Sequence, residues 1–182
     1  GGNIANASPA ADVVVALLAL DAELTLAGPN KTLRNVMLAD FLRGPGKTTR
    51  AVDELLVSVT VPKPKDRAAS TFLKAGRRKA MEISVVCIAV RLSLNSDGKV
   101  SGAGISLGAV GPTALRARES EAVLMGKAPD EVLFDEAGRL AAAACTPISD
   151  VRASAEYRRH LVEALVPRGL SQCLERMSGA AR

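Results

Sequence analysis

The first twelve residues combine two glycines, a helix start and a carboxylate in a way that suits a phosphate-bearing ligand. Gly1 and Gly2 leave bare backbone, whose N–H groups a phosphate can approach closely. Ser8 and Pro9 predict a helix that Ser8 caps, and the N-terminus of a helix attracts anions. Asp12 would then lie one turn into this helix and accept hydrogen bonds from hydroxyl groups of the ligand. The structural alternative is an ordinary loop that leads into a capped helix.

Two other features invite a chemical interpretation without supporting one. Residues 44–48 read GPGKT, but a Walker A phosphate loop needs a glycine where this sequence has Phe41, so we interpret them as a tight loop with a solvated lysine. His160 is the only histidine, and we place it on a helix surface or at an interface. Tyr157 and the two arginines after it are expected to anchor the last helix by packing and ion pairs. We predict no catalytic residue in this chain.

The composition excludes several classes of function. The net charge of +5 is spread among acidic residues and aromatics make up only 2% of the chain, which argues against nucleic-acid binding. Cys87, Cys145 and Cys173 are too far apart for an iron–sulfur or zinc site, and we predict no metal site. Unpaired cysteines are typical of a reducing, cytoplasmic compartment. No apolar run approaches the roughly 20 residues that cross a bilayer, and no signal peptide is visible.

Hydrophobic patterning places these residues on a series of elements. The predicted first helix continues to residue 20 and is apolar on most sides. We predict strands over 23–27 and 32–36, a short helix over 38–42, and a buried strand over 54–61. Residues 62–66 contain two prolines and three charges, and they predict a linker between two domains.

The remainder of the chain has strands first and helices afterwards. Strands are predicted over 70–75, 83–94 and 99–110, with a hairpin turn at 95–98. Three helical segments follow, over 116–125, 130–145 and 154–177. This order predicts an α+β fold, in which a small three-stranded antiparallel sheet is followed by helices.

The motifs together resemble those of a known family. Residues 1–12, GGNIANASPAAD, look like the second FAD motif in the flavin subunit of the molybdenum hydroxylases, the xanthine dehydrogenase and carbon monoxide dehydrogenase family. Residues 41–48, 54–62, 72–83 and 155–161 resemble later stretches of the same subunit, in the same order. The resemblance covers essentially the whole chain, and the order and spacing of the fragments make it specific.

The resemblance implies an FAD site and a role for each of its residues. The first glycines and the asparagine after them would approach the FAD pyrophosphate, and the aspartate would contact the hydroxyl-bearing part of the cofactor. A leucine of the strand over 54–61 would lie near the isoalloxazine, a lysine in the next strand would contact the flavin, and a serine would assist. The implied cofactor-binding residues are Gly1, Gly2, Asn3, Ser8, Asp12, Leu56 and Lys74.

The resemblance also implies the domain organisation. Residues 1–62 would form part of an FAD-binding (PCMH-type) α+β subdomain. Residues 66–178 would form a C-terminal domain like that of the carbon monoxide dehydrogenase flavoprotein, with a three-stranded antiparallel sheet and a helical bundle. The first FAD motif of the family, a glycine-rich pyrophosphate cradle, is missing from these residues. We therefore expect the sequence to be a fragment that holds half of the FAD cleft.

By the same resemblance, the chain is expected to serve an oxidoreductase as its electron-transfer subunit. Electrons would leave a molybdopterin on a large partner subunit, cross 2Fe–2S clusters on a small one, reach this FAD, and pass to NAD, a quinone or oxygen. The alternative is a non-catalytic structural or assembly domain with a vestigial flavin half-site. The retained Gly-Gly-Asn, Asp12 and Lys74 argue against such decay.

The basic run Arg77-Arg78-Lys79 has two interpretations. It is either a solvated turn between strands or an electrostatic patch. The patch would attract negative charge on the flavin, or face an acidic electron acceptor or partner subunit.

Overall fold

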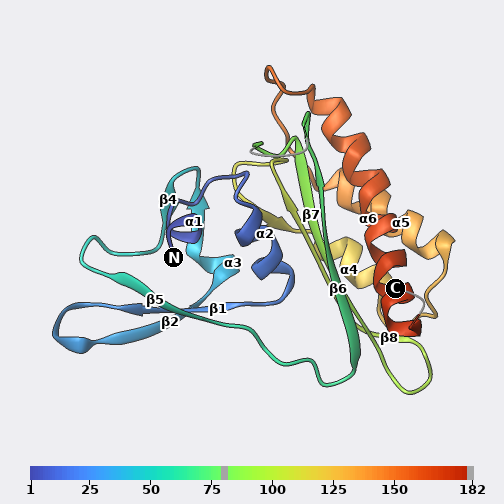
Figure 1. The fold of residues 1–182 in the computed structure, drawn as a ribbon, viewed down its shortest axis with the longest axis horizontal. Helices are drawn as coiled ribbons and strands as arrows, with labels where there is room; N and C mark the ends of the chain where they lie inside the picture. The colour runs from blue at the N-terminus through green and yellow to red at the C-terminus, as the bar shows by residue number, and fades with distance from the viewer. Residues whose placement is uncertain (79–81, 180–182) are drawn as a thin grey trace.

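The computed structural model describes residues 1–78 and 82–179 and has the predicted α+β architecture (Figure 1). Its two larger sheets are antiparallel, and neither continues into the other. Residues 79–81, which include Lys79 of the basic run, lie outside the described part of the chain.

The first sheet has strand β1 (Glu23–Ala27) at its centre. It pairs with β2 (Leu33–Met37) on one side and β5 (Leu55–Thr60) on the other. Leu24 and Leu26 point into the core and are fully buried, as alternation along a strand predicts. The prediction that β5 is buried was wrong: Leu55 is 70% exposed and most of the strand is exposed with it. A β-branched run predicts a pleated strand, but β5 lies at the edge of its sheet.

Two short connections shape this half of the chain. The 3-10 turn η1 (Pro29–Lys31) joins β1 to β2, and helix α3 (Leu38–Phe41) leads into the hairpin of β3 (Leu42–Gly44) and β4 (Lys47–Thr48). The GPGKT segment therefore forms the tip of a hairpin, as its interpretation as a tight loop predicted. Gly46 has a φ of 69° there, and its N–H donates to the carbonyl of Ala7 over 3.1 Å.

The N-terminal helix begins later than predicted. Residues Gly2–Ala5 form the short helix α1, and α2 runs over Asp12–Ala19 with Ala11 as its N-cap. Ser8 does not cap it; its hydroxyl accepts the N–H of Ala10 over 3.3 Å and closes a turn. Ala7, with a φ of 47°, reverses the chain before that turn. Asp12 is therefore the first residue of α2 and lies at its end instead of one turn inside.

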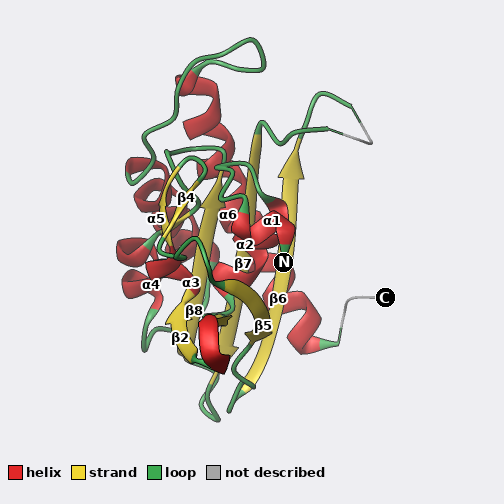
Figure 2. Ribbon diagram, turned by 90° about the vertical axis from the view of Figure 1, so that its left-hand side faces the viewer, coloured by secondary structure: helices red, strands yellow, loops and turns green. Residues whose placement is uncertain are grey.

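The second sheet has the order β6-β7-β8-β9. Its long strands are β6 (Arg67–Ala75), β7 (Val86–Leu94) and β8 (Val100–Gly108), and Figure 2 shows them side by side. The two-residue strand β9 (Leu115–Arg116) adds a fourth that the sequence did not predict. Helices α4 (Arg118–Leu124), α5 (Glu131–Ala143) and α6 (Ala155–Ser178) follow, and the side chains of Asp130 and Ser154 cap the last two.

Strand β7 is buried because the sheet is covered on both faces. Helices α5 and α6 lie on one side of it and α2 on the other (Figure 1). Ile88 and Val90 join the core beneath α6, whereas Cys87 and Ala89 join the core that contains α2 and the first sheet. The division into two domains near residues 62–66 remains a proposal, because α2 precedes that linker and still packs on the second sheet.

Close approach of α2 depends on two glycines of β8. A Cβ at Gly104 would lie 2.2 Å from the carbonyl oxygen of Ala19, and one at Gly108 would lie 2.5 Å from Cγ2 of Val15. Just past the end of the helix, Asp21 forms ion pairs with Arg91 and Arg116 of the second sheet. The helix is thus fixed along its length and at its C-terminal end.

Candidate functional site

Asp12 and Lys74, two of the residues implied as cofactor contacts, meet directly. Lys74 lies on β6, 62 residues away in sequence, and its Nζ donates to Asp12 Oδ2 over 2.7 Å. The same ammonium donates to the backbone carbonyl of Glu82 over 2.8 Å. Both side chains remain about one-third exposed, and ion pairs with such access to water contribute little to stability. The pair therefore forms a charged site that a ligand can reach.

A second donor completes the surroundings of the carboxylate. Ser84 is 1% exposed, and its Oγ donates to Asp12 Oδ1 over 2.7 Å. Partial burial raises the pKa of Asp12, but hydrogen bonds from Lys74 and Ser84 outweigh burial and leave that pKa below its ordinary value. Cys87 lies below the pair, where burial raises the pKa of its thiol to about 12. The site therefore presents an ionised carboxylate, and the buried Cys87 thiol beside it is neutral.

The glycine pair lies at the start of α1 and is open. The first N–H groups of a helix have no acceptor within it, while the carbonyl of Gly1 accepts the N–H groups of Ile4 and Ala5. A Cβ built on Gly1 or Gly2 meets nothing within 4 Å. This backbone, continued by the exposed Asn3, is therefore open to the surface.

Leu56 and Ser8 make other contacts than the Asp12–Lys74 pair. Leu56 is half-buried opposite Leu26 and packs against the core cluster that contains Ile4 of α1. Ser8 lies on the wall of a cavity of about 440 Å³, together with Ser84. Among the described residues, neither of the two forms a hydrogen bond with the pair.

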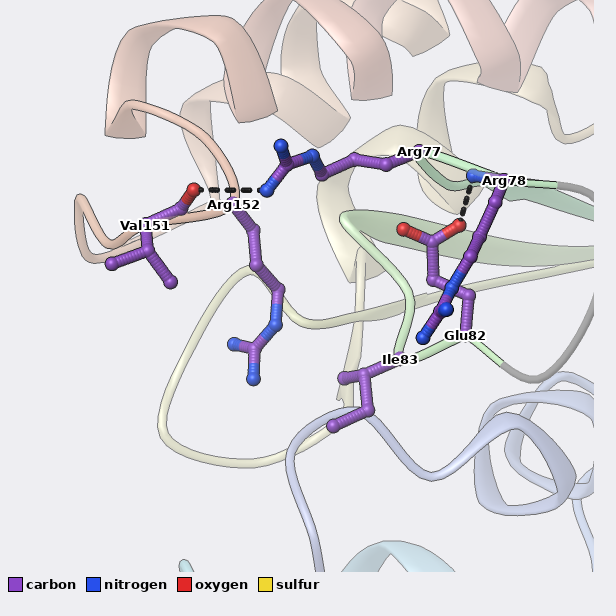
Figure 3. A pocket seen from close by; sticks show the side chains of 6 residues that line it. All are labelled: Arg77, Arg78, Glu82, Ile83, Val151 and Arg152. Carbon is purple, nitrogen blue, oxygen red and sulfur yellow. Dashed lines mark hydrogen bonds between the residues drawn. The ribbon is translucent and has the colours of Figure 1, made fainter.

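Next to the pair, a second cavity of about 580 Å³ is lined by three arginines (Figure 3). Arg77 points toward Val151 and donates to its carbonyl over 3.3 Å, while Arg78 and Arg152 extend downward in the view on either side of Ile83. Glu82, the carboxylate among the described lining residues, accepts the backbone N–H of Arg78. Partial desolvation raises the pKa of Glu82. The backbone N–H groups of Arg78 and Arg77 and the charges of these arginines lower it by more, so this pKa lies below its ordinary value. The cavity is therefore strongly positive.

Buried Arg158 joins the last helix to this region, which agrees with the expected anchoring role for that residue, whereas Tyr157 and Arg159 are exposed. Arg158 is 3% exposed and donates to the carbonyl of Val85, to that of Ala109 over 3.1 Å, and to Asp150 over 2.8 Å. Asp150 also pairs with Arg152 of the arginine cavity. Hydrogen bonds from the backbone N–H of Arg152 and from Arg158 lower the pKa of Asp150 to about 2.

Sequence reasoning missed Ser84 and Asp150. Ser84 is separated from Asp12 by 72 residues, and no local pattern marks a serine as the partner of so distant a carboxylate. Asp150 stands eight residues before Arg158, in a loop whose course the sequence does not reveal. A search for acids near the predicted anchoring arginines would have found Asp150, but no comparable signal points to Ser84.

Comparison with known proteins bears directly on these residues. Residues 1–64 match the FAD binding domain in molybdopterin dehydrogenase, and residues 71–173 match the CO dehydrogenase flavoprotein C-terminal domain. The chain belongs to the CO dehydrogenase flavoprotein family. This confirms the resemblance drawn from the sequence motifs, and it confirms FAD as the cofactor of the family. Asp12 falls in the first matched region and Lys74 in the second, so the ion pair joins the two.

Relatives of this flavoprotein chain span several dehydrogenases. It is 34% identical over 176 residues to the carbon monoxide dehydrogenase medium chain of Afipia carboxidovorans, covering 97% of this chain and 60% of that one. It is 29% identical over 180 residues to the xanthine dehydrogenase FAD-binding subunit of Escherichia coli O157:H7, covering 98% and 61%. The chain therefore spans about three-fifths of the length of these relatives.

Solved structures of the family share the fold. Carbon monoxide dehydrogenase from Hydrogenophaga pseudoflava superposes with a TM-score of 0.90 at 33% identity, over 97% of this chain and 60% of that one. Quinoline 2-oxidoreductase from Pseudomonas putida 86 gives a TM-score of 0.85 at 31% identity, over 100% and 61%. Within the described residues, no helix is long and apolar enough to span a membrane, and no three acidic, histidine or cysteine side chains gather as a metal site would require.

Proposed function

We propose that this chain holds the FAD of a molybdopterin-containing dehydrogenase and serves as its electron-transfer flavin module. The observation that carries the proposal is the Asp12–Lys74 ion pair, which joins the two matched regions at an exposed site. When bound, FAD supplies the chemistry of accepting and releasing electrons, and the protein supplies position and electrostatics.

The residues present fit an FAD. The open backbone at Gly1, Gly2 and Asn3 suits a pyrophosphate, because no side chain occupies the space that a phosphate needs. The cation and the carboxylate at the pair suit polar groups of the cofactor. The proposed set is unchanged from the sequence: Gly1, Gly2, Asn3, Ser8, Asp12, Leu56 and Lys74.

The hydrogen-bonding capacity of the pair is not exhausted by its own contacts. A lysine ammonium has three N–H donors, and Asp12 and Glu82 accept from this one. One donor is left for an acceptor atom of the flavin. A carboxylate has about four acceptor sites, and Lys74, Ser84 and the Cys87 thiol donate to that of Asp12, so capacity remains for a hydroxyl group of the cofactor. Lys74 and Asp12 can therefore bind polar groups of opposite character side by side.

The electron route extends the proposal beyond this chain. In it, an FAD held by this chain would supply the site that electrons reach from a large molybdopterin subunit by way of 2Fe–2S clusters on a small partner subunit. NAD, a quinone or oxygen takes them onward. The arginine cavity supports the electrostatic interpretation of the basic run, since Arg77 and Arg78 are joined there by Arg152. The three buried, unpaired cysteines agree with a cytoplasmic location.

The test measures flavin in the intact protein. We expect the purified complex to be yellow and to release FAD on acid treatment in proportion to this subunit. Gly2→Val should lower that proportion, because a valine side chain would occupy the approach to the pyrophosphate. The melting temperature should hold, since a Cβ at Gly2 touches nothing in the protein itself. A colourless complex with its partner subunits present would instead support the vestigial half-site.

A further inference from the structure

Ser84 is a buried serine that points at the proposed cofactor contact. It lies between the basic turn and β7, where the N–H of Val85 donates to the carbonyl of Ala75 over 2.9 Å. This bond fixes the segment at the ends of β6 and β7. The Ser84 hydroxyl, 1% exposed, then donates to Asp12 Oδ1 over 2.7 Å.

The segment 82–84 holds both members of the ion pair. The carbonyl of Glu82 accepts from Lys74, and the hydroxyl of Ser84 donates to Asp12. Lys74 and Asp12 bond to one another as well, so the contacts form a closed ring. Because separate donors hold its two oxygens, the carboxylate cannot rotate without breaking a hydrogen bond to a charged group.

A second buried serine shows what a purely structural hydroxyl does here. Ser106 of β8 is fully buried, and its Oγ donates to the backbone carbonyl of Val15 in the middle of α2. Both serines tie α2 to the second sheet. Ser106 holds only the backbone of the helix, whereas Ser84 holds the side chain that is proposed to meet the flavin.

We propose that Ser84 is a positioning residue for the flavin, which it serves by fixing the orientation of the Asp12 carboxylate beside Lys74. The inference rests on the proposed function. Without the hydroxyl, Lys74 would still hold Oδ2, but Oδ1 would lose its Ser84 donor, and the carboxylate would meet the cofactor in more than one orientation. The affinity for FAD would fall. The position of the Asp12 charge relative to the flavin would also change, in its oxidised and in its reduced form.

The experiment compares Ser84→Ala with Ser106→Ala in the full subunit within its complex. We expect both to lower the melting temperature, because each removes a buried hydrogen bond. Only Ser84→Ala should lower the affinity for FAD, by about tenfold, as expected for the loss of one hydrogen bond to a charged group. It should also shift the flavin midpoint potential, which Ser106→Ala should leave unchanged. Ser84→Thr, which retains the hydroxyl, should recover most of the affinity.

A double-mutant cycle separates positioning from a general effect on folding. In an Asp12→Ala background, Ser84→Ala should cost no further FAD affinity, since the group it positions has gone. An equal loss in both backgrounds, or equal effects of the two serine substitutions on affinity and potential, would overturn the inference. If Asp12→Ala weakens FAD while Ser84→Ala does not, this inference fails and the proposed function stands. A wild-type complex without FAD would instead overturn the proposed function.

The pH dependence of FAD binding offers a further measurement. The titratable groups that face Asp12 are Lys74 of β6 and Cys87 of β7, and the thiol stays neutral because its pKa is about 12. Ser84 helps to keep the pKa of Asp12 below its ordinary value. Ser84→Ala should therefore move the acid limb of FAD binding to higher pH. An unmoved limb would contradict the positioning role.

Discussion

The two sheets of this protein are built from similar strands, yet they differ in how well they are covered. Strand β7 of the second sheet is apolar and buried between α6 and α2. Strand β5 of the first is almost as apolar, but Leu55 is 70% exposed and Val57 54%. Apolar composition alone therefore does not decide burial; the number of covering layers does.

One ion pair from each region shows the same difference, since it is buried near the second sheet and exposed on the first sheet. On helix α6, which covers the second sheet, Arg158 is 3% exposed and is held by a carboxylate and two carbonyls. In the first, Arg34 pairs with Glu54 while its side chain is 44% exposed. An exposed apolar strand of the β5 kind is typical of a surface that other protein covers. The Asp12–Lys74 site lies where α2 of the first part meets the second sheet.

The largest effect is expected from Gly104→Ala, which would break the contact between α2 and the second sheet. Its Cβ would lie 2.2 Å from the carbonyl oxygen of Ala19, a backbone atom that cannot move cheaply. We expect the free energy of unfolding to fall by about 3 kcal/mol. Gly102→Ala on the same strand is the matched control, because its nearest neighbour would lie 3.6 Å away. Equal denaturant midpoints for the two variants would contradict the close packing.

The next effect is expected at the junction, from Asp12→Ala. It removes the partner of Lys74 and an acceptor for cofactor hydroxyl groups. We expect FAD affinity to fall by roughly ten- to a hundredfold, as for a charge-assisted hydrogen bond. The melting temperature without FAD should fall modestly, because the ion pair is partly exposed but the buried Ser84 hydroxyl loses its acceptor. A titration of the apo-complex by flavin fluorescence would measure the affinity, and an unchanged dissociation constant would remove Asp12 from the site.

A pair of acid titrations would sharpen the comparison between the sheets. Asp150 and Glu54 each have a pKa of about 2 in the folded protein, lowered chiefly by the N–H of Arg152 and by the side chain of Arg34. A carboxylate whose pKa is lower in the folded protein stabilises the fold at any pH above its ordinary pKa, which is 3.8 for Asp150 and 4.5 for Glu54. This stabilisation is lost as the pH falls towards 2. In a plot of melting temperature against pH, Asp150→Asn and Glu54→Gln should each reduce the slope between pH 2 and the ordinary pKa of the substituted residue.

The two substitutions should differ at neutral pH. Asp150→Asn leaves the buried guanidinium of Arg158 without its charged partner, whereas the guanidinium of Arg34 remains in contact with water. We therefore expect the larger drop in melting temperature for Asp150→Asn. A larger drop for Glu54→Gln would reverse the proposed ranking of the two regions.

The smallest effect is expected from Leu55→Ser on the edge strand. In the chain of 182 residues this side chain already meets water, so the free energy of unfolding should change by no more than about 0.5 kcal/mol. Leu24→Ser, on the neighbouring strand and fully buried, is the contrasting variant and should be far more damaging. Similar denaturation curves for the two would show that β5 is covered after all.

Strand and helix positions followed from the sequence where one local pattern dominates. Strand β1 spans the predicted residues 23–27, and the hairpin turn at 95–98 joins β7 to β8 as expected. The predicted start of α2 was wrong because the Ser8 hydroxyl accepts the N–H of Ala10 and closes a turn there, and Ala11 is the N-cap of the helix. Strand β9, two residues long, has too little pattern to be recognised.

The site was predictable in its members and not in its connections. Resemblance to the family identified Asp12 and Lys74 separately. Their direct bond depends on how α2 packs on the second sheet, which is a property of tertiary packing. Ser84 has no family motif and no helical or strand period to mark it. Its role depends on a contact across 72 residues.

Helix α2 is tied to the second sheet at each end as well as along its length. Asp12 bonds to Lys74 and Ser84 at one end, and Asp21 bonds to Arg91 and Arg116 just beyond the other. The covalent link through residues 62–66 is thus only one of the connections between the two parts of the chain. A protease that cut the backbone there would leave two polypeptides that remain associated and elute together from a sizing column. They would separate only in denaturant.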